Sequence, residues 1–264
     1  MKLGFIGLGN MGSAMIGGLI KKNIVKNSDI IGAEMSRERC QQVKTEFGIE
    51  IAGSNKEAAK AADVLVLSVK PQVYEIVIDD IKDSLREDTV IISIAPGKTI
   101  SWISEHFNKK IKLVRCMPNT PALVMEGCTG VVRGENVSDE EFKTVLSILS
   151  SFGKAYEVSE SQIDAVVAVS GSSPAYVFMM IEAMADAAVA EGLPRKTAYE
   201  MAAQAVYGSA KMVLETGKHP AELKDMVCSP AGTTIDAVAV LENMGFRSSL
   251  IEAMRACADK SRNM

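Results

Sequence analysis

The sequence predicts two domains, an α/β domain with a doubly wound, mainly parallel sheet over residues 1–160 and an all-helical domain over residues 161–264. Short β-branched apolar runs alternate with helical patterns up to residue 160, which is typical of a parallel sheet covered on both faces. Beyond residue 160 the strand pattern stops, and long segments rich in alanine and methionine follow. A chain of 264 residues can bury a full core in one or two domains.

Eight strands are expected in the first domain, separated for the most part by helical patterns. They cover residues 2–6, 29–33, 49–52, 64–68, 90–94, 112–116, 128–132 and 155–158. The sequence Ser-Asp-Glu-Glu at residues 138–141 is typical of a capping box, so we expect a helix to begin there.

Composition and charge disfavour several classes of protein. The 33 acidic residues exceed the 29 basic ones, so no nucleic-acid partner is expected. The five cysteines are scattered and form no CxxC pair, and only two histidines accompany them. No metal site and no Ser-His-Asp arrangement is therefore expected. A strand pattern directly after Met1 argues against a secretion signal and favours a cytoplasmic protein.

Residues 175–193 form an apolar helical run that raises the question of a membrane. Glu182, Asp186 and Glu191 interrupt it, and unpaired acids are costly near the centre of a bilayer. A helix that is apolar nearly all round is more often buried in a core or an oligomer interface. We therefore expect no membrane partner and predict a homo-oligomer.

The glycine spacing at the start of the chain predicts a dinucleotide site of the Rossmann type. Gly7, Gly9 and Gly12 form a GxGxxG motif directly between a strand and a helix. The first glycine permits the turn, the second lets a pyrophosphate approach and the third allows close packing. The start of the helix then offers free N–H groups to the anion. The candidate cofactor-binding residues of this segment are Ile6, Gly7, Leu8, Gly9, Asn10, Met11 and Gly12.

The end of the second strand carries residues that could select the cofactor. Glu34 stands where an acid would bind the adenosine ribose hydroxyls and favour NAD. Ser36 and Arg37 could instead hold a 2′-phosphate. Ser36 could also be a helix N-cap, and Arg37 could lie on a solvated helix face. Both NADPH and NADH remain open on this argument.

The carboxyl ends of the later strands supply the other candidates for cofactor binding, because these ends line the ligand crevice of a parallel sheet. They are Ser68, Val69, Lys70, Pro71, Ala95 and Asn119, with Asn55 at the start of a helical run. Simpler roles are a surface lysine for Lys70, a helix N-cap for Asn55 and a turn around Asn119.

Two loops rich in serine, glycine and proline begin helices in the second domain. One covers residues 171–176, and the other covers residues 229–234. The second places backbone N–H groups and two threonine hydroxyls at a helix N-terminus, which suits a carboxylate. Taken alone, each loop is better explained as ordinary helix capping with a proline in the first turn.

Together these motifs resemble the pyrroline-5-carboxylate reductase family from end to end. The resemblance is carried by residues 7–12, 69–71, 115–121 and 171–176, and above all by the sequence His-Pro-Ala-Glu-Leu-Lys-Asp at 219–225 followed by residues 229–234. It implies reduction of a cyclic imine to L-proline by NADPH, with NADH as the other cofactor. It also implies a homodimer through the helical domain, assembled further into a ring such as a decamer.

The resemblance further implies a role for each group of residues. Residues 7–12 would hold the pyrophosphate, Asn55, Lys70 and Pro71 would line the adenosine and ribose side, and Ala95 and Asn119 would lie near the nicotinamide. The substrate carboxylate would be bound by the loop at 229–234, and Thr234 would be the catalytic residue beside the imine nitrogen. The substrate-binding residues are Ser229, Ala231, Gly232, Thr233 and Thr234.

The chain departs from the family pattern at four positions. Ser173 and Ala231 stand where the family usually has glycine, Cys228 where it has threonine, and Pro96 where it has alanine. These changes add small side chains beside the expected pocket and stiffen the backbone near the nicotinamide. None removes a residue that hydride transfer requires.

Two other functions fit parts of the sequence. A β-hydroxyacid dehydrogenase also joins a nucleotide domain to helices, but it would need a catalytic lysine on the first long helix of its second domain. No lysine lies between Lys154 and Lys196. A non-catalytic NAD(P)-binding protein would be favoured only by the departures from the family pattern.

Overall fold

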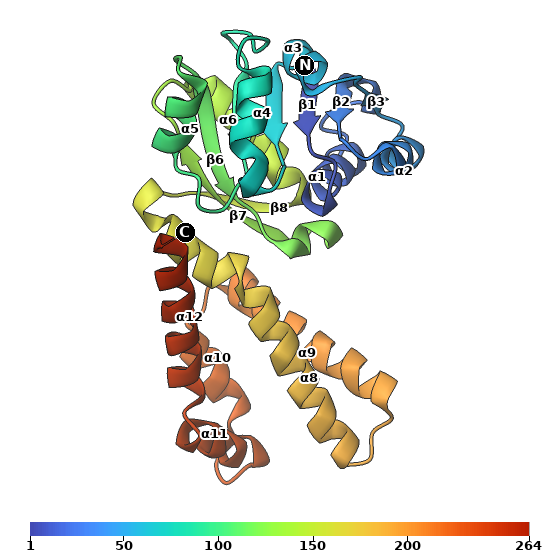
Figure 1. Cartoon of the computed structure of the whole chain (residues 1–264). Helices are drawn as coiled ribbons and strands as arrows, with labels where there is room; N and C mark the ends of the chain where they lie inside the picture. The colour runs from blue at the N-terminus through green and yellow to red at the C-terminus, as the bar shows by residue number, and fades with distance from the viewer. Residues whose placement is uncertain (264) are drawn as a thin grey trace. The chain divides into compact units, whose positions relative to one another are not determined.

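The computed structural model describes residues 1–263, and its sheet contains all eight expected strands (Figure 1). Their spatial order is β3-β2-β1-β4-β5-β6-β7-β8. The strands are β1 (Leu3–Ile6), β2 (Ile30–Ala33), β3 (Glu50–Ile51), β4 (Val64–Leu67), β5 (Val90–Ser93), β6 (Lys112–Met117), β7 (Gly127–Arg133) and β8 (Gly153–Glu157). All neighbouring pairs are parallel except β6 and β7. The predicted fold class is confirmed.

Helices cover both faces of this sheet, and strand residues alternate between two separate hydrophobic cores. One core lies under α1 (Asn10–Lys21), α2 (Arg37–Phe47) and α6 (Asp139–Leu149). The other lies under α3 (Asn55–Ala61), α4 (Tyr74–Ile81) and α5 (Ile100–Phe107). On β4, Val64 and Val66 enter the first core while Leu65 and Leu67 enter the second.

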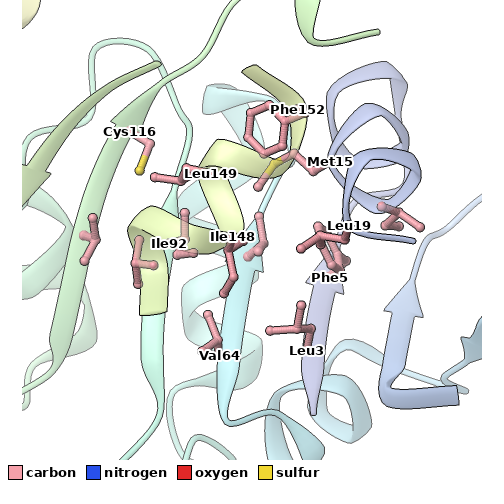
Figure 2. Packing of buried hydrophobic residues seen from close by; sticks show 14 of the residues in the cluster. Leu3, Phe5, Met15, Leu19, Val64, Ile92, Cys116, Ile148, Leu149 and Phe152 are labelled. Atoms are coloured by element: carbon pink, nitrogen blue, oxygen red, sulfur yellow. The ribbon is translucent and has the colours of Figure 1, made fainter. Parts of the chain in front are cut away.

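The first core joins the two helices that follow β1 and β7. Figure 2 shows Met15 and Leu19 of α1, Ile148 and Leu149 of α6, and Phe152 around the strand residues. All five side chains are fully buried. Each stabilises the fold by about 1.5–3 kcal/mol relative to an exposed position, so the helix that carries the glycine motif is held firmly against the sheet.

Local signals fix several helix starts. Ser138 and Glu141 form the predicted capping box at α6, with reciprocal hydrogen bonds between side chain and backbone. Ser54, rather than Asn55, is the N-cap of α3, because its hydroxyl accepts the Glu57 N–H at 3.2 Å. The suggested N-cap role of Asn55 is therefore wrong, and Asn55 is the first residue of the helix.

The chain divides into two compact units. Unit 1 contains Met1–Ser172 and the described end of the chain from Cys257, and unit 2 contains Ser173–Ala256. The division falls later than the expected boundary at residue 160 because α7 (Ile163–Val166) and a π-helical turn (Val167–Gly171) belong to unit 1. Ser261 also donates a hydrogen bond to Asp164 at 2.6 Å.

Unit 2 is helical throughout. It consists of α8 (Ser173–Ala190), α9 (Arg195–Thr216), α10 (Pro220–Val227), α11 (Thr233–Asn243) and most of α12 (Phe246–Arg262). Its only buried residues are Ala185, Ala198 and Ala202. Large apolar side chains such as Phe178, Leu214 and Met226 are exposed. The unit therefore presents an apolar surface that a second chain could cover.

One helical run, Glu160–Ala190, is long and apolar enough to meet a simple test for a membrane span. Length and composition alone are weak evidence, since helices in the cores of proteins pass the same test.

Candidate functional site

The glycine motif has the geometry that its spacing predicts. Gly7 has a φ of +95°, and a Cβ there would lie 2.7 Å from the Ser68 carbonyl oxygen. A Cβ at Gly12 would lie 2.5 Å from the Gly7 carbonyl oxygen. At Gly9, by contrast, a Cβ would meet no atom within 4 Å, so the backbone there is open to a ligand. The loop therefore packs tightly against neighbouring backbone at Gly7 and Gly12 and is accessible to a ligand at Gly9.

The start of α1 has room for an anion. Gly9 is the N-cap of this helix, and no side chain caps its first N–H groups. Unsatisfied N–H groups and the positive end of the helix dipole favour a negative group at this position. Together with the open backbone at Gly9, this arrangement fits the pyrophosphate of a dinucleotide.

Side chains from other elements hold the glycine loop in place. Ser68, after β4, donates a hydrogen bond to the Gly7 carbonyl at 2.7 Å. The Leu8 N–H donates to Glu34 Oε2 at 3.0 Å, and the Leu8 carbonyl accepts from Arg39 Nε at 2.7 Å. Arg39 also donates to the Ser13 hydroxyl at 2.7 Å. The conformation of Leu8 thus depends on two charged residues beyond the loop.

Sequence reasoning missed Arg39. It lies on α2, where an arginine in a polar helix is indistinguishable by pattern from a solvated one. Its proximity to Leu8 and Ser13 arises from the packing of α2 against α1. The sequence could have indicated only that Arg39 follows Ser36, the N-cap of α2, by three residues and therefore lies in the first turn of the helix.

The residues at the end of β2 line a cavity of about 610 Å³. Glu34, Arg37 and Asn55 all face this cavity. Ser36 is the N-cap of α2, accepting the Arg39 N–H at 3.2 Å, which confirms the simpler of its two suggested roles. Asn55 Nδ2 donates to Asp80 at 3.3 Å. This part of unit 1 has the size and polarity to hold an adenosine ribose.

The ends of β4 and β5 form a second, smaller part of the site. A cavity of about 200 Å³ is lined by Pro71, Gln72, Pro96, Gly97 and Lys98. Lys70 is exposed just before Pro71, whereas Ala95 is buried. Below them, the buried Tyr74 hydroxyl lies 2.9 Å from both the Leu67 carbonyl and the Ser93 hydroxyl. Burial raises the pKa of Tyr74, so the phenol stays neutral and supports the two strand ends.

Asn119 has a structural role that its position alone did not reveal. Its Oδ1 accepts the Cys128 N–H at 2.8 Å, and its Nδ2 donates to the Ser170 carbonyl at 2.9 Å. The residue is also buried. Its amide therefore joins β7 to the π-helical turn.

An ion pair supports the same end of β6. The largely buried Arg115 lies 2.8 Å from Glu160, whose Oε1 also accepts the Ile100 N–H at 2.8 Å. This pair ties β6 to the start of α5.

In unit 2, the loop at residues 229–234 leads into α11. Gly232 is the N-cap, and Thr233 and Thr234 are the first two helical residues. The Gly232 N–H donates to the Ser229 carbonyl at 3.0 Å, and a Cβ at Gly232 would lie only 2.3 Å from the Ser229 hydroxyl oxygen. Ala231 has a φ of +57°, which is unfavourable for a residue other than glycine. Thr233 and Thr234 thus lie in the first turn of α11, where no side chain caps the N–H groups, a position that suits a carboxylate.

Fold and site together define a two-part nicotinamide-dependent oxidoreductase, and comparison with known proteins agrees. Residues 2–97 match the family model described as "NADP oxidoreductase coenzyme F420-dependent", and residues 160–264 match "Pyrroline-5-carboxylate reductase dimerisation". The pyrroline-5-carboxylate reductase of Escherichia coli (strain K12) is 51% identical over 263 residues, covering 100% of this chain and 98% of the relative.

Solved structures give the same result. The pyrroline-5-carboxylate reductase of Coxiella burnetii has a TM-score of 0.94 and 36% identity, with 99% of this chain and 97% of that chain covered. The Plasmodium falciparum enzyme, solved with NADP bound, has a TM-score of 0.90 and 34% identity, with 100% and 97% covered. The chain belongs to the pyrroline-5-carboxylate reductase family.

Other dehydrogenases share the fold alone. A 3-hydroxyisobutyrate dehydrogenase of Mycobacterium tuberculosis is 16% identical, with a TM-score of 0.53. This chain still has no lysine between Lys154 and Lys196, where a β-hydroxyacid dehydrogenase would need its catalytic lysine.

Proposed function

We propose that this protein reduces L-1-pyrroline-5-carboxylate to L-proline with NADPH or NADH, the last step of proline biosynthesis. The observation that carries the proposal is the full-length similarity to pyrroline-5-carboxylate reductases, which spans both the glycine loop and residues 229–234. In the overall reaction, hydride enters the imine carbon, the ring nitrogen keeps a proton, and the nicotinamide is oxidised.

We assign dinucleotide binding to unit 1. The N–H groups at the start of α1 bind the pyrophosphate, with Gly9 allowing close approach. Residues at the ends of β2, β4 and β5 line the rest of the dinucleotide, including Glu34, Lys70, Pro71 and Ala95, together with Asn55 at the start of α3. Ser68 and Asn119 contribute indirectly, because their side chains hydrogen-bond the backbone of Gly7 and of Cys128 and Ser170, respectively. When bound, the nicotinamide supplies the hydride.

We assign substrate binding to the 229–234 loop of unit 2. Its N–H groups and the hydroxyls of Ser229 and Thr233 bind the carboxylate, while Thr234 hydrogen-bonds at the imine nitrogen and orients the ring. A protonated imine is already electrophilic, so the protein needs no acid–base pair of histidines or carboxylates. Its main task is to align the two reacting carbons.

The dimerisation family model over residues 160–264 supports a homo-oligomer. We propose a dimer formed through the exposed apolar faces of unit 2, further assembly into a ring of dimers such as a decamer, and a cytoplasmic location.

The proposal is tested by mixing the purified chain with pyrroline-5-carboxylate and either reduced dinucleotide, while recording nicotinamide absorbance and assaying L-proline. Imine-dependent oxidation with an equal amount of proline is expected. Folded protein that binds dinucleotide but forms no proline would instead favour a non-catalytic role.

A further inference from the structure

The end of β2 carries a fixed negative charge in the cavity assigned to the adenosine ribose. Glu34 follows directly after β2 and lines this cavity. Three backbone N–H groups hold its carboxylate: Leu8 donates to Oε2 at 3.0 Å, and Met35 and Ser36 donate to Oε1 at 2.8 and 3.2 Å. A carboxylate held from both sides cannot swing out of the cavity to make room for another anion.

Glu34 has no ion-pair partner in the described chain, and the nearby Arg39 is held by the Leu8 carbonyl and the Ser13 hydroxyl instead. The other acid of the cavity, Asp80, has a partner in Lys56 at 3.4 Å. Three N–H donors also leave part of the acceptor capacity of the carboxylate free for a ligand.

Two cations line the cavity and could oppose this effect, but neither is fixed. Arg37 and Lys44 line the cavity and are exposed, and no carboxylate pairs with either of them within the described chain. Lys44 lies in the last turn of α2, away from Glu34 at its other end. An exposed, flexible cation gains little from pairing with an anion, because solvent screens the attraction and the side chain loses freedom.

We infer that Glu34 makes this chain prefer NADH to NADPH, an inference that rests on the proposed function. A hydroxyl of an unmodified ribose can donate to the acceptor site that the three N–H groups leave free on the carboxylate. A 2′-phosphate in the same place would bring about two negative charges against a carboxylate that cannot move away. Glu34 is thus the residue that determines specificity, and Arg37 reduces the discrimination without reversing it.

The experiment is calorimetric titration of the full-length protein with NADH and with NADPH, in the absence of imine. For the wild type we expect a Kd for NADH at least about tenfold lower than that for NADPH. Glu34→Gln keeps the size of the side chain and an oxygen acceptor but removes the charge. It should tighten NADPH binding about tenfold while NADH binding stays equal or weakens.

Two further variants test whether the effect comes from charges in this cavity or from the net charge of the protein. Glu38→Gln removes an acid from the exposed first turn of α2, outside the cavity, and should leave the ratio of the two Kd values unchanged. Arg37→Gln in the Glu34→Gln background should weaken NADPH binding and leave NADH binding unaffected. Thermal unfolding of each variant reports whether the fold is retained.

The outcomes distinguish this inference from the function on which it rests. Binding of both dinucleotides with equal or tighter affinity for NADPH overturns the inference and leaves the proposed reductase intact. An equal loss of both affinities in Glu34→Gln overturns it too, because Glu34 would then only hold the glycine loop. Failure of the wild type to bind either dinucleotide overturns both proposals.

Discussion

The two units of this chain bury their apolar residues in different ways. Unit 1 places fully buried leucine, isoleucine and phenylalanine side chains on both faces of its sheet, whereas three alanines are the only buried residues of unit 2. Yet unit 2 is rich in methionine and aliphatic residues, many of them exposed. Unit 1 therefore contains the core it needs for stability, and we expect unit 2 to depend on apolar contacts from a second chain. Five predictions test this contrast and the roles assigned to each unit.

The largest effect is expected from a cavity in the core of unit 1. Phe152 is fully buried between α1 and α6. Phe152→Ala should lower the free energy of unfolding by about 3–5 kcal/mol. Chemical denaturation measures this loss, and Tyr156→Ala, at an exposed position of β8, is the control. A loss below about 1 kcal/mol would show that this core is not closely packed.

A charge on the apolar surface of unit 2 should act on assembly instead. Phe178 is 62% exposed in the single chain. Phe178→Glu should weaken the dimer at least about a hundredfold, because an interface would bury the new carboxylate without a partner. Sedimentation at several protein concentrations measures the effect. An unchanged dimer would remove Phe178 from the interface, and monomers already present in the wild type would contradict the contrast between the units.

Removal of the proposed catalytic hydroxyl should affect the imine and not the dinucleotide. Thr234→Ala should lower kcat/KM for pyrroline-5-carboxylate by about 10- to 100-fold, the effect of losing a hydrogen bond to a charged group. Calorimetric Kd values for NADH should stay unchanged. Ser209→Ala, which removes an exposed hydroxyl of α9, is the matched control. Unchanged imine kinetics would exclude the role assigned to Thr234.

Substitution of Arg39, which the sequence did not single out, should have a smaller effect and should act on dinucleotide binding by unit 1. Arg39→Met keeps the apolar stem but removes the hydrogen bonds to Leu8 and Ser13. We expect about tenfold weaker binding of both dinucleotides, because the glycine loop loses one of the three side chains that hold it. Arg37→Met, on the same helix, should spare NADH binding. Equal effects of the two changes would point to charge rather than to support of the loop.

The smallest effect concerns the unusual backbone of the 229–234 loop. Ala231→Gly relieves a positive φ at a residue other than glycine. The change should raise the free energy of unfolding by no more than about 1 kcal/mol, since glycine also has more freedom in the unfolded chain. Denaturation measures it, with Ala221→Gly on α10 as a control that should destabilise. Lower stability of Ala231→Gly would mean that alanine is not strained there.

Local patterns were sufficient to predict much of this molecule. Strand positions followed from short apolar runs bounded by turn residues, and the glycine loop followed from its spacing between a strand and a helix. Asn119 and Arg39 show where such reasoning ends. Their hydrogen bonds to Ser170 and Leu8 reach across 51 and 31 residues, so only the folded chain brings the partners together. The edge strand β3 is shorter than expected, since only Glu50 and Ile51 form ladder pairs with β2.

The most direct test of the proposed function is to follow the transferred hydride. The protein would be given pyrroline-5-carboxylate and NADH deuterated at the transferring position of the nicotinamide, and the product analysed by mass spectrometry. We expect one deuterium per L-proline, on the ring carbon that was doubly bonded to nitrogen. Oxidised cofactor without deuterated proline would contradict the assignment of this chain as an imine reductase.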